Sequence, residues 1–343
     1  MANGLFRKKP LKLLLEEMAG EHRLHRVLGP VQLTSLGVGA TIGTGIFVLT
    51  GVVANSKTGP ALMLSYLLTG VACGFAALCY AEIAAMIPVA GSAYTYSYIA
   101  FGEVVAWIIG WDLTIEYAVG NIYVAASWAD YLRSFLRGTL GVDFPAWLAT
   151  DLQTAAKTPE IAAVAPHIGD FVVAFNLPAF FITVLLNILL IIGVKESARV
   201  NTGMVIFKVL LVFGFIVTGS FFVDKANWTP FAPNGWKGIW TGASIAFFSY
   251  IGFDAVSTAA EETKNPQRNM PIGILGGLAI CTVLYIATAA VLTGLVPYQK
   301  LATADPLAHA LELLGFPRLA SFMALGAVVA MTAVLLEIGR AHV

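Results

Sequence analysis

Long apolar runs dominate this chain and restrict the solvent in which it can fold. A helix that crosses ~30 Å of hydrocarbon needs ~20 mainly apolar residues, and eight runs meet that length. They cover residues 31–54, 61–87, 94–126, 177–194, 199–223, 240–260, 272–296 and 318–336. Only 12% of the 343 residues are charged, whereas soluble domains carry roughly 25%. Because lipid forces backbone groups to bond within helices or closed barrels, and these runs are too long for barrel strands, we expect an all-α polytopic membrane protein.

The polar residues indicate which functions are absent. Twenty basic and twenty acidic residues cancel, so no nucleic-acid partner is expected. The three cysteines lie inside apolar runs without the spacing of metal ligands, and the histidines lie in the predicted tail and loops. We therefore expect a protein that is not an enzyme and that has no cofactor and no metal site.

Basic residues near the ends of the predicted spans indicate the orientation. With the N-terminus inside, the inner segments hold more lysine and arginine than the short outer loops, including Lys195, Lys264 and Arg268. The sequence thus predicts a multi-pass protein of the plasma membrane with a cytoplasmic N-terminal tail, residues 1–30. Residues 11–18 of that tail are expected to form a surface helix or a disordered segment.

The first predicted span is unusually rich in glycine. Gly37, Gly39, Gly43, Gly45 and Gly51 fall within it, and each interior glycine lowers helix stability by ~1 kcal/mol relative to alanine. A local break would expose backbone groups, which membranes tolerate only where these groups line a cavity or a ligand site. Close helix packing through small residues is the alternative explanation.

The sixth predicted span carries a second candidate break. Ser249 and Gly252 are weak helix formers in the middle of the span, and Asp254 places a carboxylate at membrane depth. The two interrupted spans stand five helices apart. This spacing is typical of two inverted repeats of five helices, with the ligand bound between the breaks.

Four stretches together resemble the amino acid–polyamine–organocation (APC) superfamily, and within it the cationic amino acid transporter family. They are residues 37–48 (GVGATIGTGIFV), 80–96 (YAEIAAMIPVAGSAYTY), 247–254 (FFSYIGFD) and 261–271 (EETKNPQRNMP). The resemblance covers nearly the whole chain. It implies a LeuT-like fold of five-plus-five helices and secondary active transport of an amino acid across a lipid bilayer.

The resemblance also implies a binding site between the two breaks. The substrate carboxylate would bind N–H groups around Ile42, Gly43, Thr44 and Gly45, where a helix N-terminus attracts an anion. The ammonium would bind carbonyls of the sixth helix. Those carbonyls lie near Phe248, Ser249 and Ile251, and the rings of Phe248 and Tyr250 would gate access or pack in the bundle.

Lys208 is the sharpest single candidate because it lies about ten residues into the fifth span. Charged residues at membrane depth are usually functional. Since burial penalises a charged ammonium, this lysine could gain and lose a proton during transport. In the resembled family, proton-driven members have a lysine here, which implies a contact with helix-one carbonyls near Gly39 or Ala40. A structural lysine paired with a buried carboxylate is the alternative.

Glu116 is a second ionisable candidate, within the third span. Its carboxylate could contact the substrate ammonium or a cationic substrate side chain. It could equally pair with another polar group of the bundle. The sequence leaves both open.

The chain is shorter than the resembled family, which has twelve or more spans. We expect a first repeat over residues 31–223 with an outer loop at 127–176, and a partial second repeat over 240–336. Residues 337–343 match the translation of a common sequencing adapter. They are therefore expected to be an artefactual tail of a fold truncated after about eight helices.

The sequence thus predicts a proton-coupled amino-acid symporter that works by alternating access. An exchanger and a non-transporting amino-acid sensor stay open. The substrate side chain, cationic or small and neutral, and the oligomeric state are not determined by these patterns.

Overall fold

The computed structural model describes residues 8, 10, 25–192 and 198–341. The predicted surface helix at 11–18 lies outside these residues. The described part is mainly helical, with one short hairpin of β1 (His167–Ile168) and β2 (Phe171–Val172). The all-α prediction is therefore confirmed.

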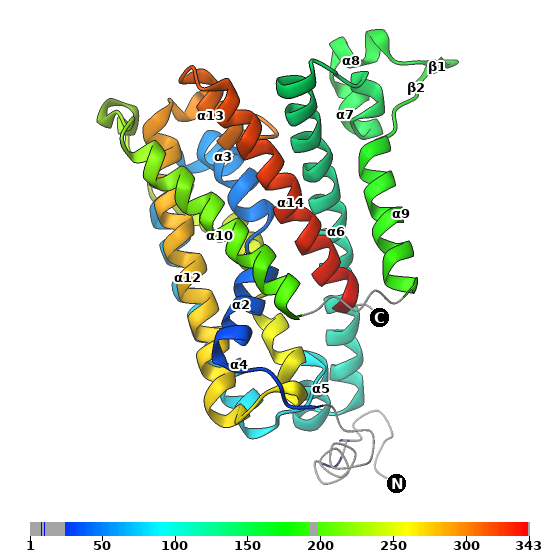
Figure 1. The fold of residues 1–343 in the computed structure, drawn as a ribbon, viewed down its shortest axis with the longest axis vertical. Coiled ribbons are helices and arrows are strands. Elements are labelled where there is room, and N and C mark those ends of the chain that lie inside the picture. The colour runs from blue at the N-terminus through cyan, green and yellow to red at the C-terminus, as the bar shows by residue number, and fades with distance from the viewer. Residues whose placement is uncertain (1–7, 9, 11–24, 193–197, 342–343) are drawn as a thin grey trace.

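Six long helices lie side by side along the long axis of the molecule (Figure 1). They are α4 (Leu62–Met86), α6 (Glu103–Leu140), α9 (Leu177–Ile192), α10 (Ala198–Ser220), α12 (Pro266–Leu295) and α14 (Pro317–Ala341).

Shorter helices complete two interrupted spans and cap the ends of the bundle. They are α2 (Pro30–Thr41), α3 (Thr50–Val53), α5 (Ser92–Ala100), α7 (Leu152–Lys157), α8 (Pro159–Val164), α11 (Gly235–Ala246) and α13 (Pro306–Leu313). Figure 1 places α5 at one end of the bundle and α7, α8 and α13 at the other.

Five helical stretches of the described chain are long and apolar enough to cross a membrane. They are Gly45–Met86, Thr202–Ser220, Gly235–Glu262, Pro266–Leu295 and Pro317–Glu337, and the apolar Leu177–Ile192 is shorter. A polytopic membrane protein is thereby supported. The third expected span is not among the five, and its helix α6 carries acidic residues such as Asp112 and Glu116.

Three expected boundaries are wrong. The third span was expected over 94–126, but the chain turns at Gly102, whose φ of 96° suits glycine, and α5 and α6 are separate helices. Helix α6 then continues to Leu140, so the connection expected at 127–176 starts later. Good helix formers such as Ala129, Leu132 and Leu136 extend it beyond the apolar run. Similarly, α14 continues through Ala341 rather than ending near 336.

The helices pack in two groups. Helix α12 packs along α4 and α2, and α11 packs on α4, whereas α14 packs along α6 and α9. Helix α10 contacts α2 and α12 of the first group and α14 of the second. The interrupted spans therefore belong to the first group and face the second group across their breaks.

Hydroxyl groups join α4 to α11 within the apolar interior. Ser65 donates to the carbonyl of Ile239 at 2.8 Å, and Thr69 donates to the carbonyl of Ala243 at the same distance. Both side chains are buried. Because lipid offers no alternative partner, such bonds fix how two apolar helices face each other.

The starts and ends of the two interrupted spans are also tied by backbone bonds. The N–H groups of Val27 and Leu28 donate to the carbonyl of Glu262 at 2.9 and 3.0 Å, and Lys264 N–H donates to the Leu28 carbonyl at 2.9 Å. The segment before α2 is thus held against the segment after residue 262.

We predict that replacing both hydroxyl donors, Ser65→Ala with Thr69→Ala, lowers the free energy of unfolding by ~1–2 kcal/mol, because interhelical bonds in membrane proteins are worth ~0.6 kcal/mol each and at most ~1.7. The change in the free energy of unfolding is measured by unfolding the protein in detergent micelles. The matched control is Thr183→Ala, whose hydroxyl donates to a carbonyl of its own helix. Equal stability of the double variant and the control would contradict the role given to these bonds.

Candidate functional site

The first span is interrupted close to its middle. Helix α2 ends at Thr41, Ile42 adopts an extended conformation with ψ of 98°, and a π-helical turn begins at Gly45. The Gly43 carbonyl accepts from the N–H groups of Ile46 and Phe47 at 3.2 and 3.4 Å, so a new helix starts there. The first N–H groups of a helix have no intrahelical acceptor, which leaves those at Gly43 to Gly45 available to a ligand.

The sixth span is interrupted at the same depth. Helix α11 ends at Ala246 and tightens into a 3-10 turn over Phe247–Tyr250. Ile251 is then extended and Gly252 has a φ of 103°, after which a second 3-10 segment runs over Phe253–Glu262. Both predicted interruptions are therefore present in the structure.

The two breaks touch each other through their glycines. A Cβ atom on Gly45 would lie 2.5 Å from the Cβ of Ser249, and a Cβ on Gly252 would lie 2.9 Å from the carbonyl oxygen of Ala40. Real Cβ atoms do not come this close to other heavy atoms. Glycine is required at both positions because the two main chains approach without space for a side chain.

Two buried tyrosines form hydrogen bonds with backbone carbonyl groups at the breaks. The Tyr285 hydroxyl, from α12, lies 2.8 Å from the Thr41 carbonyl and 2.6 Å from the Ser249 carbonyl. The Tyr66 hydroxyl, from α4, donates to the Gly45 carbonyl at 3.0 Å and lies 3.5 Å from the Ser249 hydroxyl. Both rings are fully buried. Their hydroxyl groups connect the first and sixth spans.

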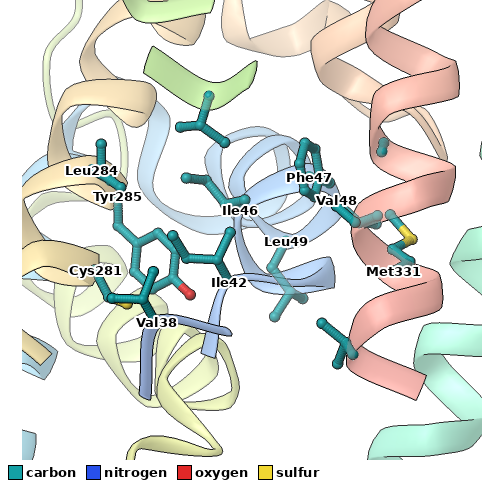
Figure 2. Packing of buried hydrophobic residues seen from close by; sticks show 14 of the residues in the cluster. Val38, Ile42, Ile46, Phe47, Val48, Leu49, Cys281, Leu284, Tyr285 and Met331 are labelled. Carbon is teal, nitrogen blue, oxygen red and sulfur yellow. The ribbon is translucent and has the colours of Figure 1, made fainter. Parts of the chain in front are cut away.

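The segment that follows the first break packs in two directions. Figure 2 shows Ile42 beside the ring of Tyr285. On the other side, Val48 lies near Met331 of α14 in the same view. The Tyr131 hydroxyl of α6 donates to the Phe47 carbonyl at 2.6 Å. This segment therefore contacts both helix groups.

A cavity of about 350 Å³ lies against both breaks. Its lining comprises Ala40, Thr41, Gly43, Thr44, Gly45, Leu49, Val119, Gly120, Tyr123, Val124, Ile245, Phe248, Ile251 and Val334. The volume falls within the range of small-molecule sites. Its walls come from α6, α11, α14 and the two breaks.

The structure brings most of the predicted binding residues to this cavity. Gly43, Thr44, Gly45, Phe248 and Ile251 are part of its lining. The Ile42, Ser249 and Tyr250 side chains are instead buried behind it, and the Tyr250 hydroxyl donates to the Tyr66 carbonyl at 2.9 Å. Ile42 and Ser249 could contribute only main-chain groups, and Tyr250 shapes the site through packing.

Glu116 lines a neighbouring cavity of about 510 Å³, together with Asp112 and Asp254. The two cavities share Val119, Phe248 and Ile251 as a common wall.

The Asp254 carboxylate accepts hydrogen bonds from two hydroxyl groups beside the second cavity. It accepts from the Ser92 hydroxyl at 3.1 Å and from the Tyr117 hydroxyl at 3.3 Å. Asp254 thus lies directly after the second break, and its carboxylate is held by α5 and α6 in the second cavity rather than in the lining of the first.

Lys208 is fully buried in the interior of α10. Its ammonium donates to the carbonyl of Gly39, two residues before the end of α2. The Glu337 carboxylate approaches the same place, since a Cβ on Gly39 would lie 2.6 Å from its Oε1 atom. The structure therefore joins Lys208 to the first break, and a carboxylate stands close by.

Sequence reasoning missed Tyr66, Tyr285, Tyr123 and Gly120. A detectable signal existed for two of them, because Tyr66 and Tyr285 stand within apolar spans and a buried phenol needs a hydrogen-bond partner. The partners themselves are carbonyls of other spans, which no local pattern reveals.

Comparison with known proteins agrees with this geometry. The amino acid permease family matches residues 28–338. The chain belongs to the amino acid permease family. Families of this kind are transporters rather than enzymes.

Three relatives illustrate the range of similar proteins. The chain is 45% identical to the methylthioribose transporter of Bacillus subtilis over 341 residues, 99% of this chain and 70% of the relative. It is 45% identical to the branched-chain amino acid permease BcaP of the same organism over 337 residues, 98% of the chain and 69% of the relative. It is 42% identical to the chloroplastic cationic amino acid transporter 9 of Arabidopsis thaliana over 316 residues, 91% of the chain and 53% of the relative.

We predict that Gly45→Ala lowers the free energy of unfolding by ~1–3 kcal/mol, since the new methyl group overlaps Ser249 and forces the breaks apart. Substrate binding should be lost even where the variant folds. Unfolding temperature and ligand-induced stabilisation in detergent measure the two effects. Gly74→Ala on α4 is the control, because nothing lies within 4 Å of its added Cβ. A Gly45→Ala protein that binds as well as this control would show that the contact is dispensable.

Proposed function

We propose that this chain forms the substrate-binding core of a secondary active amino-acid transporter. The observation that carries the proposal is the contact between two interrupted spans, which leaves helix-end N–H groups and carbonyls beside one cavity. Such freed groups at membrane depth suit a ligand with a negative and a positive end. An amino-acid zwitterion has both.

The carboxylate would accept from the N–H groups of Gly43, Thr44 and Gly45, at the positive end of the helix that starts after the first break. The ammonium would donate to carbonyls of the second break near Phe248 and Ile251. The Thr41 and Ser249 carbonyls already interact with Tyr285, but each carbonyl oxygen has a second lone pair.

The architecture proposed for the full protein is the inverted repeat of five helices. Residues 31–223 would form the first repeat, and 240–336 would form part of the second. The chain spans about 70% of the two bacterial relatives and about half of the plant relative. The two helix groups suit alternating access, in which the group with the breaks rotates against the group of α6 and α14.

Lys208 is the proposed coupling residue. Its ammonium binds the Gly39 carbonyl next to the first break, so loss of its proton would remove the charge that strengthens this hydrogen bond and weaken the attachment of α2 to α10. The alternative is a structural lysine balanced by the nearby Glu337 carboxylate. An exchanger without net proton movement and an amino-acid sensor could retain the same cavity.

A ribose derivative is the second candidate ligand, because one 45% identical relative is a methylthioribose transporter. Methylthioribose has neither a carboxylate nor an ammonium, so it would use the breaks only through neutral hydrogen bonds. The paired helix ends favour the zwitterion. We propose the plasma membrane as the location of the protein. Its N-terminus would be cytoplasmic, since basic residues are enriched on that side.

We predict that the full-length protein in proteoliposomes accumulates labelled amino acid, and that an inward proton gradient increases the initial uptake rate. Empty liposomes and liposomes with the Gly45→Ala variant are the controls. Uptake of methylthioribose but of no amino acid would contradict the proposal. Amino-acid binding without any uptake would favour the sensor.

Removal of the buried ammonium provides a separate test. We predict that Lys208→Ala abolishes the dependence of uptake on the proton gradient while the amino acid still binds. Lys237→Ala, which removes an exposed ammonium, should leave the dependence intact. If Lys208→Ala keeps the proton dependence but lowers the unfolding temperature, the lysine is structural and the coupling role is refuted.

A further inference from the structure

The cavity beside the breaks has a polar side and an apolar side. The breaks supply the polar main-chain groups, whereas Val119 and Val124 of α6, Ile245 of α11 and Val334 of α14 supply an apolar wall. None of the described residues that line it carries a charged side chain. A substrate held by its zwitterionic end would therefore direct its side chain toward hydrocarbon.

Gly120 lies in this apolar wall, and no neighbouring helix packs so closely that the position requires glycine. A Cβ added there would meet nothing within 4 Å, and the residue lies in the middle of a 38-residue helix. Two other glycines of α6 differ, because a Cβ on Gly110 would lie 3.1 Å from Tyr94 and one on Gly138 would lie 2.5 Å from Ser321. Neighbouring helices explain those two but not Gly120.

Open space beside Gly120 is space within the cavity. Glycine weakens a helix relative to alanine. Its presence at position 120 therefore lowers the stability of α6 and leaves the cavity larger. The Glu116 carboxylate, one turn earlier on α6, belongs to the lining of the neighbouring cavity and not to the lining of this one. A side chain that fills the space beside Gly120 would contact the uncharged side chains of this lining.

We infer that Gly120 determines the size of the substrate side chain, and that the preferred substrates are neutral amino acids with an aliphatic side chain. This inference rests on the proposed function, because it assumes that the α-amino and α-carboxyl groups bind the breaks. An alanine methyl group at position 120 would occupy the space of a substrate methyl group without touching a neighbouring protein atom.

Binding of a panel of amino acids to Gly120 variants tests this. Dissociation constants for glycine, alanine, valine, leucine and lysine would be measured by ligand-induced stabilisation of the full-length protein in detergent. The variants are Gly120→Ala and Gly120→Val, and Gly214→Ala on α10 is the matched control, because its added Cβ also meets nothing within 4 Å and it does not line the cavity.

We expect wild-type protein to bind leucine more tightly than lysine. Gly120→Val should weaken leucine binding ~10–200-fold, the range by which one misfitting methylene group discriminates in an apolar pocket. Gly120→Ala should give a smaller loss, and glycine and alanine should bind both variants as well as the wild type. The control should keep the wild-type order.

Several results would overturn the inference. An unchanged preference for leucine in both Gly120 variants, with their unfolding temperatures retained, would refute the size role. Tighter binding of lysine than of leucine to the wild type would refute the neutral aliphatic class. Wild-type protein that binds no amino acid would instead contradict the proposed function and this inference together.

Discussion

The contact between two broken helices determines the rest of this structure. Gly45 lies against Ser249 and Gly252 lies against Ala40, with no room for a side chain at either glycine. Continuous helices would consume their own N–H and carbonyl groups, and the bilayer supplies no replacement. The interruptions are therefore stable only because other groups of the protein form hydrogen bonds with backbone groups that have lost their partners within the helix.

Those groups come from the helices on both sides of the breaks. Tyr66 and Tyr285 reach the carbonyls from α4 and α12, and Lys208 reaches the Gly39 carbonyl from α10. An unsatisfied buried backbone group costs several kcal/mol in lipid, so each of these bonds supports the open geometry. Gly43, Thr44 and Gly45 line the cavity at the start of the new helix, which is why we assign the anionic end of a substrate to their N–H groups.

Much of the fold could be predicted from the sequence, because hydropathy and glycine placement are local properties. The apolar runs and the two interruptions at Gly43 and Gly252 followed from them. The end of α6 at Leu140 did not, since this helix continues beyond the apolar run that marked its span. The turn at Gly102 was missed for a related reason, because the predicted span joins the apolar residues before Gly102 and after Glu103 into one run.

The candidate site was predicted as a set of segments rather than as a set of side chains. Spacing along one helix identifies which residues flank a break, but the direction of each side chain depends on the helix packed behind it. Ser249 and Tyr250 thus face α4 and α12, whereas Phe248 and Ile251 face the cavity. Gly120 could not be found from sequence, because an empty space beside a glycine exists only in three dimensions.

The central claim is that the first break binds the carboxylate of the substrate. An experimental structure of the full-length protein with a bound amino acid tests it most directly. The account predicts carboxylate oxygens roughly 2.7–3.2 Å from the backbone nitrogens of Gly43, Thr44 or Gly45, the range of ordinary N–H···O bonds. A carboxylate bound elsewhere, or a first span that is continuous through Ile42 and Gly43, would contradict it.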